Sequence, residues 1–132
     1  MIVIYHNPAC ETSRNVLAFI RVVEEPVVIA YLETGWTRAQ LLGLFAAANV
    51  TPRQALRISG TTAGAMGLLD PALTDEAMLQ AMVAHPILVN RPFVCSPRGT
   101  RLCRPSETVI ALLPQPPGPL VKEDGTPVEP AG

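Results

Sequence analysis

The chain has 132 residues, of which 48% are hydrophobic and 16% charged, and its formal net charge is −1. This balance fits one packed domain, excludes a disordered chain, and offers no broad positive surface for binding nucleic acid. No apolar run approaches the ~20 residues that a membrane-spanning helix needs, so we expect no membrane span. No positive residues precede the apolar start, so we expect no secretory signal and a cytoplasmic protein.

The first thirty residues alternate between strand and helix patterns. Residues 2–5 are β-branched or aromatic and predict a strand, and the loop that follows it contains Pro8. From Ser13 the apolar residues recur at helical spacing until Pro26 ends the helix, and 27–31 then predict a second, buried strand. A strand, a helix and a strand in this order form the βαβ unit of an α/β fold.

The middle of the chain is predicted to be mainly helical. Thr37 and Gln40 form a capping box at the start of one helix. Residues 51–57 are compatible with a short helix, and residues 74–83 predict a longer one. Between these two segments, 60–71 is rich in Gly and Thr and predicts a loop.

The last third predicts strands, one more helix and a tail. We expect strands at 87–89, 93–95 and 101–103, the last two joined as a hairpin by a Pro-Arg-Gly turn. Pro105 is predicted to open a final helix at its first position. The helix should pack through Val109, Ile110 and Leu113. From residue 114 onward prolines recur, which excludes a helix and predicts an irregular tail.

Three cysteines, Cys10, Cys95 and Cys103, are spread along the chain. An odd number without an export signal does not suggest a disulfide framework. We therefore expect reduced thiols in a reducing compartment.

Cys10 lies between the first strand and the first helix, where exposed backbone N–H groups and the helix dipole favour anions. Such a position stabilises a thiolate and also an oxyanion beside it. Thr12, Ser13 and Arg14 add hydroxyl donors and a positive charge that could contact a substrate. His6 could add a further positive charge if it is protonated. The alternative is that Cys10 is a small buried residue at the start of a helix.

The neighbours of Cys10 also exclude two kinds of thiol chemistry. Val16 stands where a phosphatase-type site would carry its arginine, and Ser13 stands where a Cys-x-x-Cys redox site would carry its second cysteine. A single nucleophile is what remains.

Residues 4–15, IYHNPACETSRN, resemble the active-site segment of the glutaredoxin-coupled arsenate reductases. A second block, HPILVNRPFV at 85–94 with GTRLCRPSE at 99–107, is similar to the same family. The similarity extends from residue 2 to about residue 125 and includes the Lys-Glu-Asp-Gly turn of the tail.

This resemblance implies an α/β, thioredoxin-like fold, in which a mixed sheet is flanked by helices. It implies one domain over 1–113 with a helical insertion at about 33–85, followed by the Pro-rich irregular tail, 114–132, packed on the domain or trailing from it. It further implies a cis peptide bond before Pro92, beside the active cysteine.

The resemblance also assigns roles to single residues. The nucleophile falls on Cys10, and the histidine that helps to lower its pKa falls on His6. The arginines that bind the oxyanion fall on Arg57, Arg91 and Arg104.

The implied reaction converts arsenate to arsenite through a covalent adduct with the Cys10 thiol, and glutathione and glutaredoxin are the reductants. No metal and no bound cofactor are expected, glutathione acts as a co-substrate, and the protein is expected to be a monomer.

Several alternatives remain open from the sequence. The chain could be a non-catalytic regulator of the Spx type on the same scaffold, or a thiol oxidoreductase with another substrate. Cys95 or Cys103 could relay electrons internally by attacking oxidised Cys10. Glu11, next to the nucleophile, could raise the Cys10 pKa and slow the attack.

Overall fold

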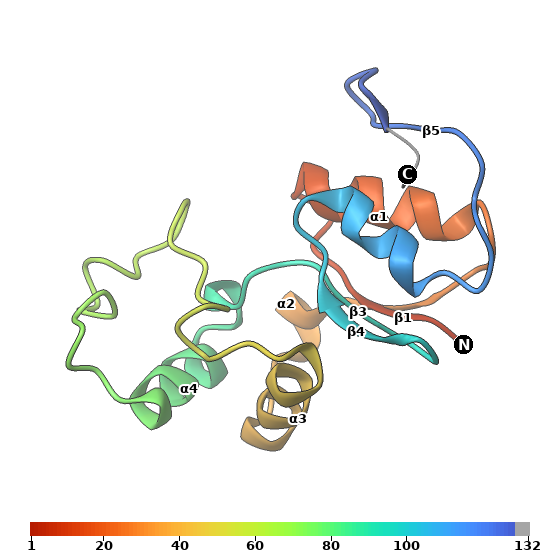
Figure 1. Ribbon diagram of the computed structural model, residues 1–132. Helices are drawn as coiled ribbons and strands as arrows, with labels where there is room; N and C mark the ends of the chain where they lie inside the picture. The colour runs from red at the N-terminus through yellow and green to blue at the C-terminus, as the bar shows by residue number, and fades with distance from the viewer. Residues whose placement is uncertain (129–132) are drawn as a thin grey trace. The chain divides into compact units, whose positions relative to one another are not determined.

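The structure is a computed structural model that describes residues 1–128, so residues 129–132 of the predicted tail lie outside the described residues. The chain forms two compact units (Figure 1). The first consists of residues 1–30 together with the chain from Arg91 onward, and the second is Tyr31–Asn90. The predicted insertion, 33–85, falls within the second unit.

The first unit contains a four-stranded mixed sheet. The strands are β1 (Val3–Tyr5), β2 (Val27–Ile29), β3 (Phe93–Ser96) and β4 (Gly99–Leu102), and their order in the sheet is β2-β1-β3-β4. β1 runs parallel to β2 and antiparallel to β3, and β3 pairs antiparallel with β4. The predicted βαβ unit and the predicted hairpin are therefore both confirmed.

Helix α1 (Glu11–Arg21) and the 3₁₀ helix η2 (Ser106–Leu112) pack against each other on one side of this sheet (Figure 1). Apolar side chains from both helices meet those of the central strands, which forms the core of the unit. The core residues are Ile2, Ile4, Val16, Phe19, Ile20, Val94, Cys103, Val109, Leu112, Leu113, Leu120 and Val128.

The second unit is helical. It contains α2 (Tyr31–Thr34), α3 (Arg38–Ala48), α4 (Asp75–Ala84) and the 3₁₀ helix η1 (Pro86–Leu88). α3 packs against α4. At the start of α3 the backbone and side chain of Thr37 both bond to the residue three positions on, so the predicted capping box is confirmed.

Three segments differ from the prediction. Residues 51–57 form turns that end in an isolated bridge between Leu56 and Val89. The predicted strand at 87–89 is instead η1, because Pro86, with its fixed φ, stands at the first helical position. The strand at 27–31 ends at Ile29, and it is half-exposed because it lies at the edge of the sheet.

The last helix and the tail also differ from the prediction. Pro105 precedes the helix, and η2 is a 3₁₀ helix that begins one residue later. The tail is not irregular throughout, because β5 (Leu120–Val121) and β6 (Pro127–Val128) form an antiparallel hairpin. This hairpin is held because its apolar ends, Leu120 and Val128, enter the core of the first unit.

In the described part of the chain, none of the helices combines the length and the apolar character that crossing a membrane requires.

The burial of Leu120 predicts that the tail contributes to stability. Leu120→Ala should lower the free energy of unfolding by about 2–4 kcal/mol, because it leaves a cavity in the core. Val121→Ala is the matched control, since Val121 is the next residue of the same strand and its side chain is 61% exposed. Urea denaturation of both variants measures the difference, and equal stabilities would contradict the placement of Leu120.

Candidate active site

The loop between β1 and α1 presents Cys10 as the N-cap residue of α1, with extended backbone angles (φ −98°, ψ 121°). The position predicted for Cys10 is therefore confirmed. The thiol is nearly buried, with 6% of the residue exposed.

Asn7 holds this loop in shape. Its backbone carbonyl accepts from the Cys10 N–H at 3.1 Å, and its side-chain oxygen accepts from the Ala9 N–H at 3.0 Å. Its own N–H donates to Ser13 Oγ at 3.1 Å. Asn7 was not among the predicted site residues, although an Asn directly before a proline is a signal for a turn that is closed by its side chain.

The pKa of the Cys10 thiol is lowered from its ordinary value. Burial acts in the opposite direction, because it disfavours the charged thiolate. The hydrogen bond from the Ser13 backbone N–H and the charges of Arg91 and Arg104 together outweigh burial. Arg104 also donates from Nη1 to Cys10 Sγ at 3.6 Å.

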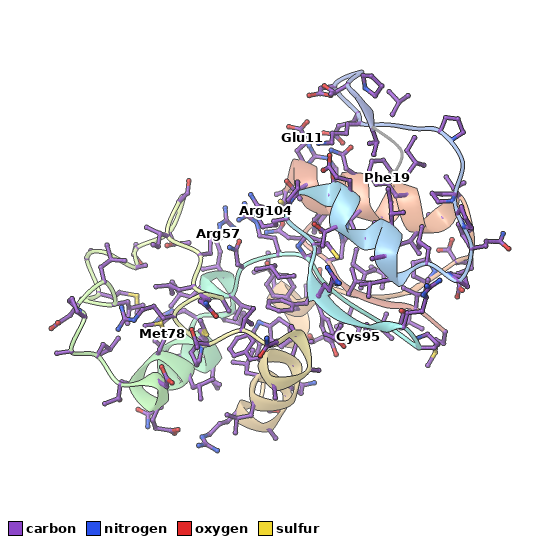
Figure 2. The ribbon with its side chains drawn as sticks, in the orientation of Figure 1. Glu11, Phe19, Arg57, Met78, Cys95 and Arg104 are labelled. Carbon is purple, nitrogen blue, oxygen red and sulfur yellow. The ribbon has the colours of Figure 1, made fainter. Side chains whose placement is uncertain are left out.

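Two of the predicted arginines are brought to the cysteine from segments far along the chain (Figure 2 labels Arg104). Arg104 Nη1 also donates to the backbone carbonyl of Arg91 at 3.2 Å, which links the two arginines. Each of them precedes a cis proline, Pro92 and Pro105. The cis bond expected at Pro92 is confirmed, and the one at Pro105 was not predicted.

His6 is buried, and its Nδ1 shares a hydrogen bond of 2.6 Å with Ser13 Oγ. Burial lowers the pKa of His6, and the charges of Arg21 and Arg14 lower it further. A lower pKa favours the neutral imidazole, and a catalytic role for His6 stays a prediction. His6 reaches the thiol indirectly, because it fixes Ser13, whose N–H bonds to the thiolate.

The three residues after Glu11 differ in what they can offer a substrate. Ser13 is fully buried and its hydroxyl is already bonded to His6 and Asn7, so its backbone N–H is the group that faces the sulfur. Arg14 is bound by the Glu123 carboxylate. Thr12 is half-buried, and its role in substrate binding stays a prediction.

Arg57 belongs to the second unit, and its role in binding the oxyanion stays a prediction. Its Nε donates to the carbonyl of Ser59 at 3.0 Å. A Cβ added at Gly60, where φ is +74°, would lie 3.1 Å from Arg57 Nη2. The guanidinium is thus held by a tight local turn that favours glycine.

The other two thiols differ strongly from Cys10. Burial raises the pKa of Cys103 to about 12, and this residue is fully buried in the core. Cys95 lies in β3, paired with Val3 at the beginning of β1, whereas Cys10 follows the end of β1. All three cysteines are free thiols.

Residue Glu11 is exposed in the first turn of α1. Its negative charge raises the pKa of Arg14, a smaller effect than that of Glu123. The expectation that Glu11 raises the Cys10 pKa stays a prediction.

Within residues 1–128, no three His, Cys, Asp or Glu side chains gather in a way that could hold a metal ion.

Comparison with known proteins assigns the chain to a family. The model of the ArsC family matches residues 5–112, a span that includes Cys10 and all three predicted arginines. The chain belongs to the ArsC family. This bears out the resemblance seen in the two sequence blocks.

Relatives within the ArsC family match along almost their whole length. A Synechocystis protein named arsenate reductase ArsI2 is 59% identical over 127 residues, which are 95% of this chain and 91% of the relative. An arsenate reductase of Rhizobium meliloti is 55% identical over 133 residues, covering 99% and 95% of the two chains.

A solved arsenate reductase from Vibrio cholerae is 36% identical and superposes with a TM-score of 0.80, covering 85% of this chain and 97% of its own. The thioredoxin-like fold, with a mixed sheet, flanking helices and a helical insertion between the N-terminal βαβ unit and the later strands, is thereby confirmed.

The contact between Arg104 and the thiol predicts a change in reactivity. Arg104→Gln should slow alkylation of Cys10 by iodoacetamide about 3- to 10-fold at pH 7, because less of the thiol is ionised. The control is Arg101→Gln on the neighbouring strand, because the charge of Arg101 acts on Cys103. Mass spectrometry of the labelled peptide against pH measures both rates, and equal rates would refute the assigned contact.

The lowered pKa of His6 predicts a loss of stability in acid. The unfolded chain takes up a proton below pH 6.5, the ordinary pKa, while folded His6 does so only at a lower pH. Stability should therefore fall as the pH drops below 6.5, and His6 should contribute nothing to this slope at higher pH.

His6→Asn should reduce this acid-dependent loss relative to the wild type. Urea unfolding at several pH values compares them, and a slope unchanged in His6→Asn would count against a neutral, buried His6.

Proposed function

We propose that this chain is an arsenate reductase in which the Cys10 thiolate is the nucleophile. The observation that carries the proposal is a thiol at the start of α1 whose pKa is lowered and which Arg104 contacts at 3.6 Å. Family relatives named arsenate reductase support arsenate as the substrate.

In the first step the Cys10 sulfur forms a bond to arsenic and a hydroxide leaves as water after taking up a proton. Arg91 and Arg104 neutralise the oxyanion, and Arg57 is proposed as the third guanidinium. Planar guanidiniums suit a tetrahedral oxyanion because they donate two hydrogen bonds side by side.

In the second step glutathione provides the reducing thiol. Its sulfur bonds to the Cys10 sulfur while the sulfur–arsenic bond breaks, and that electron pair stays on arsenic. Arsenic(V) thus becomes arsenic(III) and leaves as arsenite, and the two thiols are oxidised to a mixed disulfide. Glutaredoxin then reduces this disulfide and restores Cys10.

An external thiol is favoured over an internal relay. Attack on oxidised Cys10 requires a thiolate, and a thiol with a pKa of about 12 in the core, such as Cys103, supplies almost none at neutral pH. Cys95 is paired in the sheet with the start of β1, away from the end that leads to Cys10. The proposal includes a monomeric protein in a reducing cytoplasm, where glutathione is available.

A coupled assay tests the proposal. NADPH consumption is followed with glutathione, glutaredoxin and glutathione reductase, with and without arsenate. Wild type should show arsenate-dependent turnover, and Cys10→Ser should lose it by at least about 100-fold, because a serine hydroxyl is not ionised at neutral pH. Absence of arsenate-dependent turnover in the wild type would refute the assignment.

The matched control is the double variant Cys95→Ser/Cys103→Ser, which leaves Cys10 as the only thiol. It should keep glutathione-dependent turnover, whereas a loss with an intact fold by circular dichroism would point to an internal relay. Omitting glutaredoxin, or replacing it by thioredoxin, identifies the reductant.

A further inference from the structure

The turn between β5 and β6, Lys122–Gly125, contacts two other segments of the first unit through ion pairs. The turn is closed by its own backbone, since the Lys122 N–H donates to Thr126 at 2.8 Å and the Gly125 N–H donates to Lys122 at 2.9 Å. The strands on both sides are anchored because Leu120 and Val128 are buried in the core. The turn is thus an ordered part of the fold and not a free chain end.

The first tie is to the helix that carries Cys10. The Glu123 carboxylate accepts from Arg14 Nε at 3.0 Å and from Arg14 Nη2 at 2.6 Å, and the Glu123 N–H donates to Asn15 Oδ1 at 2.8 Å. The third side of the same guanidinium, Nη1, donates to the carbonyl of Pro8 at 2.9 Å. Glu123 thereby reaches the loop before Cys10 through one arginine.

The second tie is to the segment that carries Arg104. Lys122 Nζ lies 3.2 Å from the carboxylate of Glu107, and the two side chains are 23% and 37% exposed. Glu107 follows Arg104 by three residues and stands in η2. The two neighbouring residues of the turn therefore hold the two segments whose side chains meet at the thiol.

We propose that the Lys122–Gly125 turn is a clamp that sets the distance between the Cys10 thiol and Arg104, with Lys122 and Glu123 as positioning residues. Exposed ion pairs add little to stability, so the effect of the clamp is expected on the geometry of the site and not on the fold. The thiol–guanidinium contact weakens steeply as it lengthens, because charge-assisted hydrogen bonds need a short and aligned approach. The effect of the clamp on arsenate reduction rests on the proposed function, whereas its effect on the Cys10 thiol does not.

The test is the double variant Lys122→Ala/Glu123→Ala, which removes one charge of each sign and leaves the net charge unchanged. Alkylation of Cys10 at pH 7 should slow by about 3- to 10-fold, with its pH profile moved to higher pH, because the thiolate loses part of its stabilisation. The kcat/KM for arsenate should fall by a similar factor.

The matched control is Arg38→Ala/Glu76→Ala, which removes another exposed ion pair, with a two-point contact of 2.7–3.1 Å, in the second unit. It should leave the alkylation profile unchanged, and the melting temperatures of the two double variants should differ little. A Lys122→Ala/Glu123→Ala profile that matches the wild type would overturn the proposal.

Two further measurements keep the result interpretable. If the double variant does not fold, Glu123→Ala alone, which removes the carboxylate that accepts from Arg14, replaces it, and an unchanged alkylation rate there overturns the clamp. If the wild type reduces no arsenate but the double variant still slows alkylation, the clamp stands and the proposed function fails.

Discussion

The lowered pKa of the Cys10 thiol is what the other groups of the candidate site have to maintain. Burial alone would keep the thiol neutral, so charges and a backbone donor must outweigh the loss of solvent. The donor is the Ser13 N–H in the first turn of α1, and the charges belong to Arg91 and Arg104. Each of these groups depends on distance and alignment, and the surrounding loop is held by several hydrogen bonds.

The loop before Cys10 is held by the buried polar side chains of Asn7 and His6. Asn7 uses its N–H, its carbonyl and its amide oxygen to hold Ser13, Cys10 and Ala9. His6 completes the arrangement on Ser13 as a neutral ring. A neutral His6 avoids placing a buried charge beside Arg14 and Arg21, which would be unfavourable.

Arg14, which was predicted from the sequence to bind substrate, also helps to hold this loop. Its guanidinium is bound on one edge by Glu123 and braces Pro8 with the remaining nitrogen. A cation one turn into the helix therefore acts as a link between the tail and the loop. The charges that act on the sulfur belong to Arg91 and Arg104. Arg91 precedes β3 and Arg104 follows β4, the two strands on the opposite side of β1 from β2.

Features that depend on residues close together in the chain could be predicted from the sequence. Helical spacing and capping predicted α1 and α3, and strand-like residues on both sides of a Pro-Arg-Gly turn predicted the β3–β4 hairpin. The position of Cys10 followed from a strand that ends just before a helix. The prediction failed at 87–89 and at 27–31, because a short apolar run does not reveal whether it lies at a sheet edge or in a 3₁₀ turn. The lowered pKa of His6, the raised pKa of Cys103 and the contact of Glu123 with Arg14 could not be predicted, because each depends on burial or on contacts across about a hundred residues of chain.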